Sequence, residues 1–167
     1  MIKPILAVCL GASLLACTPS LNWREVTLDR MTTLLPCKPD TAQRQLSING
    51  QVVAMKMAGC EAGGALYAIS HTRTTVDAAA GLQGAWAEAT LANLQARAQA
   101  GQTLTGVKGD AGKTVRMEAS GRRPDGAEVQ ARLAWIISGG DVFHLAVYAD
   151  QLPPDANDTF FSDIKIQ

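Results

Sequence analysis

The stretch TVRMEASGRRPDGAEVQARLAWIISGGDVFHLAVYA, residues 114–149, alternates apolar and polar side chains over much of its length. Such alternation is typical of β-strands, whose successive side chains point to opposite faces of a sheet. Turn residues at 124–126 and 138–141 divide the stretch into three consecutive strands. The short connections between them predict an antiparallel β-meander.

The loop at 124–126 sets the register of the first two strands. A three-residue loop with its glycine in the left-handed bulge position places Met117 opposite Leu133. On the other face it places Glu118 opposite Arg132, a favourable pair of opposite charges. A two-residue loop would set Met117 against Arg132 instead, so we prefer the three-residue loop.

The third strand is apolar on both faces over residues 142–149. A strand of this kind is typical of the centre of a sheet that is covered on both sides. In the predicted register His144 lies near Trp135 on a packed surface, which favours a satisfied core histidine over a general base.

Upstream, Asn49-Gly50 is a strong two-residue hairpin signal because both turn residues need positive φ. The turn pairs Leu46 with Val53, and continuing its register places Cys60 opposite Pro39, two residues from Cys37. The residues predicted to share the apolar face of this hairpin are Leu46, Ile48, Val53, Met55 and Met57.

Between the hairpin and the meander, an alanine-rich segment predicts a helix capped by Asp77 and running to Ala100, with Gly101 after it. Leu82 and Trp86 lie off its predicted apolar stripe, so a bend in the helix or a start near Ala85 is the alternative. That stripe consists of Ala87, Leu91, Leu94 and Ala98. Further expected elements are strands at 23–28, 66–70 and 164–166 and a short helix at 155–161. The order predicts an α+β fold: an antiparallel sheet covered by one long and one short helix.

The N-terminus reads as an export signal. Lys3 precedes an apolar run, residues 4–16, that is too short to span a bilayer. A buried N-terminal strand or helix is the alternative. The run ends in Leu14-Leu15-Ala16-Cys17, which resembles the lipobox of bacterial lipoproteins. This resemblance implies cleavage before Cys17, acylation of Cys17 and a stable anchor in the membrane.

Thr18, at the position where Asp would mark inner-membrane retention, implies the outer membrane, with the protein facing the periplasm. The expected organisation is a signal peptide (1–16), a lipidated N-terminus and tether (17–22) and a single α+β domain (23–167).

The expected organisation assigns a different role to each part of the set of four cysteines. Cys9 leaves with the signal peptide and Cys17 is lipidated. Cys37 and Cys60 remain, and an oxidising compartment favours a disulfide between them. The alternatives are a zinc site or a catalytic thiol. Zinc would need two further ligands, and neither histidine lies near either cysteine in sequence.

The elements resemble the PsbP/DcrB-like superfamily of small exported or extrinsic α/β/α domains. Residues 35–39, LPCKP, resemble its LPGKP-type turn, with Cys37 in place of the more usual glycine. Residues 159–166, TFFSDIKI, resemble its closing FFxSF-type helix and strand, with Asp163 in place of an aromatic residue. The superfamily has no common catalytic set, so the resemblance implies a fold and no site.

Composition excludes some classes of function. The 167 residues hold 15 basic and 15 acidic side chains, and a balanced, scattered charge argues against nucleic-acid binding. An apolar content of 47% argues against disorder. The glycine-rich segment 109–114 is not a P-loop, because Val107 stands where that motif needs glycine and a strand follows it.

Catalytic groups are sparse. Ser70-His71 and Asp141 with His144 could supply parts of a hydrolytic triad, but no nucleophile motif accompanies them. We expect His71 to be exposed and inert and Arg122-Arg123 to be a solvated hairpin tip. Met55 and Met57 could line a ligand pocket or simply fill the core, and Trp23 and Trp86 could anchor packing or rim a groove.

We therefore expect a non-catalytic binding or accessory module of the bacterial envelope, with no cofactor and no metal. Its partner would be an envelope protein, besides the membrane that holds the anchor. The alternative is a carrier for an apolar small molecule held between sheet and helix. An enzyme is the third hypothesis.

Overall fold

The computed structural model describes residues 21–98 and 101–167, and within them it contains two sheets and two helices. The larger sheet is antiparallel throughout; the smaller one has a single parallel pair, β11 with β7. The order in the larger sheet is β3 (Asp40–Ile48), β4 (Gln51–Ala62), β5 (Ala65–Arg73), β10 (Asp141–Ala149), β9 (Glu128–Ser138), β8 (Thr114–Arg122) and β6 (Arg97–Ala98). In the smaller sheet it is β1 (Arg24–Leu28), β2 (Met31–Leu35), β11 (Ile164–Ile166) and β7 (Val107–Gly109). The helices are α1 (Val76–Asn93) and α2 (Pro154–Ser162).

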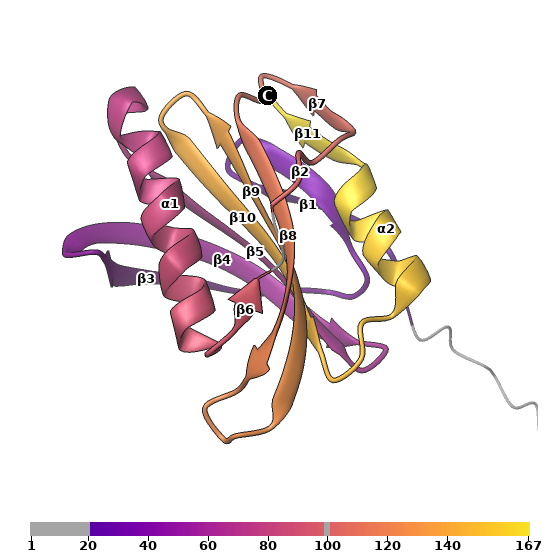
Figure 1. The fold of residues 1–167 in the computed structure, drawn as a ribbon. Helices are drawn as coiled ribbons and strands as arrows, with labels where there is room; N and C mark the ends of the chain where they lie inside the picture. Colours follow the sequence, from indigo (N-terminus) through magenta and orange to yellow (C-terminus); the bar gives the residue numbers. More distant parts are fainter. Residues whose placement is uncertain (1–20, 99–100) are drawn as a thin grey trace, which may run out of the picture.

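The elements form layers around the larger sheet (Figure 1). Helix α1 covers one face, where Leu82 and Trp86 pack against Leu133 and Trp135 of β9. The smaller sheet and α2 cover the other face, and Phe160 is among the side chains they bury there. The predicted α+β class is confirmed. None of the helices in the described residues is long and apolar enough to cross a bilayer.

The predicted register of the meander is confirmed. Met117 lies opposite Leu133, and Glu118 lies opposite Arg132. Gly126 has φ of 87°, a left-handed conformation that glycine adopts without strain. Strand β10 lies between β5 and β9, so its predicted central place is confirmed as well.

The hairpin at Asn49-Gly50 also has the predicted register, with Leu46 opposite Val53. Both turn residues have positive φ, 48° and 79°. The pairing carries Cys60 to the neighbourhood of Cys37, and the two form a disulfide with their Cα atoms 6.0 Å apart. The predicted disulfide is therefore present in the structure.

The predicted boundaries and buried face of the long helix are wrong. Thr75, not Asp77, is the N-cap residue, and the helix ends at Asn93. Beyond it, the carbonyl of Leu94 accepts a hydrogen bond from the amide of Arg122, and β6 pairs with β8. Gly121 permits this approach, since a Cβ there would lie 2.3 Å from the Leu94 carbonyl oxygen. The helix itself ends in a local turn, in which Gln95 adopts positive φ of 47° and the amides of Gln95 and Ala96 donate to the carbonyls of Ala92 and Leu91.

The side chains that α1 buries are Ala79, Leu82, Gln83 and Trp86. The predicted stripe is only partly buried at Ala87, Leu91 and Leu94, and Ala98 lies outside the helix. Small alanine side chains gain little from burial, so the two large apolar side chains decide which face meets the sheet.

Strands β2 and β7 were not predicted. β2 follows β1 through a turn at Asp29-Arg30, where Asp29 adopts positive φ without the usual Asn-Gly signal. The short helix and the closing strand lie where expected, as α2 and β11.

Candidate functional site

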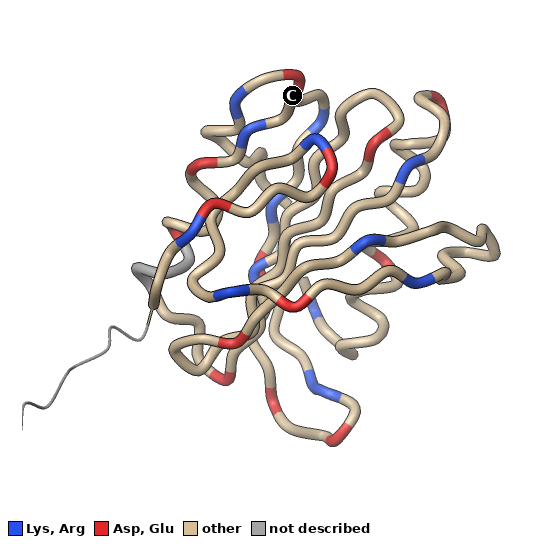
Figure 2. Tube along the Cα trace, turned by 180° about the vertical axis from the view of Figure 1, so that it is seen from behind, with Lys and Arg blue, Asp and Glu red and all other residues tan. Residues whose placement is uncertain are grey.

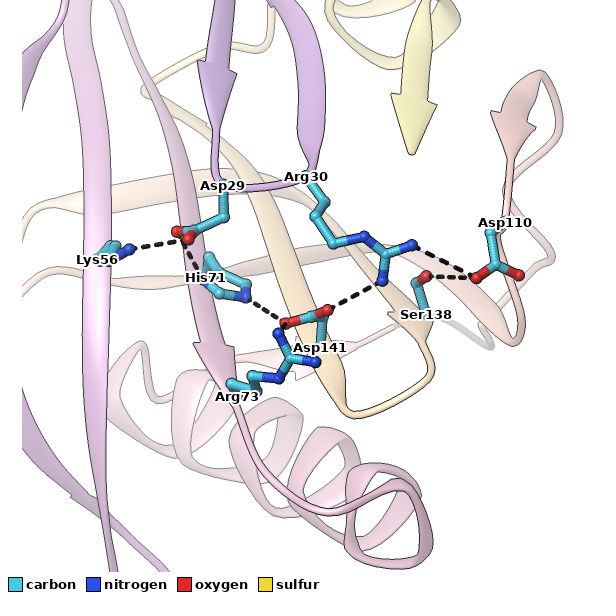
Figure 3. Close-up of polar contacts among 8 residues, drawn as sticks. All are labelled: Asp29, Arg30, Lys56, His71, Arg73, Asp110, Ser138 and Asp141. Atoms are coloured by element: carbon cyan, nitrogen blue, oxygen red, sulfur yellow. Dashed lines mark hydrogen bonds and ion pairs between the residues drawn. The ribbon is translucent and has the colours of Figure 1, made fainter. Parts of the chain in front are cut away.

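His71 lies at the centre of a polar cluster (Figure 3). The prediction that it is exposed is wrong. It sits near the end of β5 and is only 6% exposed. Its Nδ1 lies 2.9 Å from Asp29 Oδ2, and its Nε2 lies 2.9 Å from Asp141 Oδ1. The ring also stacks on Phe143, with centroids 4.8 Å apart. The histidine is thus held on both ring nitrogens and on one face.

Asp141 begins β10, and its side chain is only 2% exposed. Its second carboxylate oxygen accepts a hydrogen bond from Arg30 at 3.2 Å, and Arg73 lies 3.8 Å from the first. Arg30 also reaches Asp110 at 3.5 Å. A buried carboxylate without partners would be costly, and here two guanidinium groups and an imidazole surround it.

The turn between β1 and β2 supplies two members of this cluster, Asp29 and Arg30. Lys56 of β4 donates a 2.8 Å hydrogen bond to Asp29. This bond, together with the charges of Lys56 and His71, holds the pKa of Asp29 below its ordinary value despite the opposing effect of burial. The cluster therefore fastens the β1–β2 turn to the end of the larger sheet.

The cluster is poorly suited to catalysis. Each ring nitrogen of His71 lies 2.9 Å from a carboxylate oxygen, Nδ1 from Asp29 and Nε2 from Asp141. Neither nitrogen is available to a nucleophile. Ser70 points to the opposite face of β5, and the Ser138 hydroxyl lies 3.5 Å from Asp110 rather than at His71. The contacts of Asp29, Arg30, His71 and Asp141 instead hold the β1–β2 turn against the larger sheet, and we call this group the clamp.

Neutralising Asp141 tests the clamp. Asp141→Asn should lower the free energy of unfolding by about 3 kcal/mol, because it removes the charge of a buried carboxylate that His71 and Arg30 share, leaving Asp29 as the carboxylate at His71 and the exposed Asp110 at Arg30. Asp110→Asn is the matched control: it removes an ion pair to the same Arg30 from a side chain that is 77% exposed, and should cost under about 1 kcal/mol. Denaturant unfolding of both variants measures this, and equal losses would contradict the clamp.

His144 faces α1, on the opposite side of the sheet from Asp141, so the two do not form part of a triad. It stacks on Trp135 at 4.5 Å and meets Trp86 at 5.2 Å. Burial lowers the pKa of His144 to about 3, so its ring is neutral at physiological pH. The core position is confirmed, but the expectation of a satisfied histidine is wrong, since Nε2 has no hydrogen-bond partner among the described residues.

The residues considered for a ligand pocket belong to the core. Met55 and Trp86 are buried in the cluster that also contains Leu133 and Trp135, and Met57 packs against it. Trp23 contacts Tyr67 edge-on, with ring centroids 6.0 Å apart. These methionines and tryptophans act as packing groups.

The remaining candidates are also accounted for. Thr114 begins a strand, as predicted, so the glycine-rich segment before it does not form a P-loop. Arg123 pairs with Asp150 at 2.7 Å, so the hairpin tip is not merely solvated. Cys17 lies outside the described residues. Within those residues no three His, Cys, Asp or Glu side chains are grouped to hold a metal ion.

Sequence reasoning missed Asp29, Arg30 and Asp110 entirely. The one local signal was the Asp29-Arg30 pair between two short strands, and it does not reveal that the turn lies against β5 and β10. Arg30 and Asp141 are 111 residues apart in the chain.

Comparison with known proteins adds little to this picture. No family model matches the chain, and no curated protein matches it. Among solved structures, one similar chain is PA94, a protein of unknown function from Pseudomonas aeruginosa. The alignment covers 81% of this chain and 86% of that one, with 10% identity and a TM-score of 0.38. The likeness is distant and assigns neither a family nor a function.

Proposed function

We propose that the protein is a lipid-anchored lipoprotein of the bacterial envelope whose folded domain is a non-catalytic binding or accessory module. The observation that carries the non-catalytic part of the proposal is that neither histidine of the chain is placed to act as a general base. His71 is held by two carboxylates, and His144 is buried between two tryptophans. We therefore expect the domain to act by binding a partner on its surface.

The envelope location is supported by the N-terminal sequence, by the disulfide and by the family resemblance. The lipobox-like Leu14-Leu15-Ala16-Cys17 supports acylation, and Thr18 supports the outer membrane. The Cys37–Cys60 disulfide is in keeping with an oxidising compartment such as the periplasm. The weak PsbP/DcrB-like resemblance is compatible with a small exported domain.

The charge distribution and the filled core favour a protein as the partner over a nucleic acid or an apolar ligand. Basic and acidic residues are interspersed along the described chain (Figure 2), whereas nucleic-acid binding needs a basic face. The carrier alternative has less support, because Met55 and Trp86 help to fill the space between α1 and the sheet.

The anchor is tested by fractionation. Cys17→Ser should remove the acylation site, and the protein should move from the membrane fraction to the soluble fraction, because each buried methylene of an acyl chain contributes about 0.8 kcal/mol to anchoring. Mass spectrometry of the wild type should show an acylated Cys17 at the N-terminus. An unmodified Cys17, or a retained Met1, would contradict the proposal.

The binding role is tested in intact cells. A photoreactive amino acid is placed in turn at exposed positions on different elements: Gln45 of β3, Glu88 of α1 and Asp125 of the β8–β9 loop. We expect a specific adduct with one envelope protein from at least one position. Only self-adducts, or none at any position, would contradict a binding role.

A further inference from the structure

We propose that the outer edge of β3 binds an extended segment of another envelope protein, which adds to the larger sheet as an extra strand. The inference rests on the proposed binding function and names its surface and kind of partner. Its starting point is the order of the sheet, in which β3 is the outermost strand.

The edge of β3 is long and open. Eight of its nine residues are exposed, and among the described residues only β4 pairs with it. Figure 1 shows the β3–β4 hairpin projecting beyond α1. An edge strand presents unpaired backbone groups that a further strand can use.

The register identifies these groups. In a two-residue hairpin the residues that flank the turn, here Ile48 and Gln51, exchange both backbone hydrogen bonds. Hydrogen-bonded and non-hydrogen-bonded positions then alternate along the strand. The backbone groups that point outward are therefore those of Thr41, Gln43, Gln45 and Ser47.

The usual protections of an edge are few here. Proline, a bulge or several charged side chains commonly prevent unwanted pairing. β3 contains no proline, its pairing with β4 is continuous from Asp40 to Ile48, and its single basic residue is Arg44. The strand can therefore accept a neighbour over its length.

The side of β3 that faces α1 favours an apolar side chain in the partner. Leu46, on this side, is 38% exposed. Next to it, a groove of about 300 Å³ separates the hairpin tip from α1, and its lining includes Ile48, Gly81 and Ala85. A Cβ at Gly81 would meet nothing within 4 Å, so this part of the groove is open.

Arg44 argues for a partner other than a second copy of this chain. The antiparallel register that engages all four outward residues of both copies would place Arg44 directly opposite Arg44, and like charges in that position are destabilising. An acidic side chain opposite Arg44 would be stabilising instead. The expected segment is therefore extended, with an acidic residue facing Arg44 and an apolar residue toward Leu46.

Proline substitution isolates the backbone contribution. The amide of Gln43 points outward, so Gln43→Pro removes an edge donor and keeps the ladder to β4, while Gln43→Ala changes only the side chain. With the photoreactive group at Gln45, we expect Gln43→Pro to reduce the adduct by about tenfold or more and Gln43→Ala to leave it nearly unchanged. Mass spectrometry should locate the adduct in an extended segment with an acidic residue.

Each possible result of this experiment either supports or contradicts the proposal. An adduct that survives Gln43→Pro overturns strand addition at this edge, and an adduct formed with a second copy overturns the proposed partner. Adducts only at Glu88 or Asp125 overturn it too, while leaving the proposed binding function intact. If Gln43→Pro fails to fold by circular dichroism, Arg44→Glu, with Arg44→Gln as its control, takes its place. Arg44→Glu should reduce the adduct more than Arg44→Gln does, and equal effects would overturn the proposal.

Discussion

Replacing Leu133 with alanine should lower the free energy of unfolding by about 2–5 kcal/mol. Leu133 is fully buried under α1, in contact with the cluster that contains Trp86 and Trp135. The truncation removes apolar contacts and leaves a cavity that the surrounding sheet can close only in part. Denaturant unfolding measures the loss.

Arg132→Ala is the control for the register of β8 and β9, because Arg132 is next to Leu133 in β9 and points to the opposite face of the sheet. Its side chain is 15% exposed and bonds Glu118 at 2.6 Å, so the pair is partly buried. We expect a loss of about 1 kcal/mol. A larger loss for Arg132→Ala than for Leu133→Ala would mean that the register of the meander is shifted by one residue.

Acidification should destabilise the protein through His144. Its pKa is about 3 in the folded state, because of burial, and 6.5 as an ordinary histidine. The unfolded chain therefore binds a proton below about pH 6.5 that the folded protein does not bind until near pH 3. Stability is fully present above that window and falls by up to about 1.4 kcal/mol per pH unit within it.

His144→Gln removes this titration. Between pH 7 and pH 4.5 the wild type should lose about 2–3 kcal/mol more of its unfolding free energy than the variant does. Other groups, including Asp29, titrate in both proteins and cancel in the difference. Parallel stability curves for the two proteins would contradict a buried neutral histidine.

Much of the fold could be predicted because the residues of its turns determine the turn type and therefore the register of the strands on either side. Asn49-Gly50 and the loop at 124–126 each fix a register by backbone chemistry alone, and the register of the first carries Cys60 to the region of Cys37. The interior strand β10 was recognisable because its apolar character on both faces needs cover on both sides.

The features that could not be predicted depend on contacts between distant segments. The path of the chain after α1 depends on the close approach of Gly121 to Leu94, which lets β6 pair with β8. The burial of His71 depends on a turn that arrives from β1 and β2, with Asp29 42 residues upstream in sequence. Contacts of this kind leave no signal in the local sequence around the residues that make them.

The strand addition proposed at the outer edge of β3 requires that this edge be unpaired in the isolated protein, and amide hydrogen exchange measures this directly. In the isolated protein the outward amides of Gln43 and Gln45 should exchange rapidly, while the inward amides of Arg44 and Leu46, bonded to β4, should be protected. Adding a synthetic peptide of the crosslinked segment should protect Gln43 and Gln45 as well. Equal protection of all four amides in the isolated monomer, or no change at Gln43 and Gln45 with the peptide, would contradict the claim.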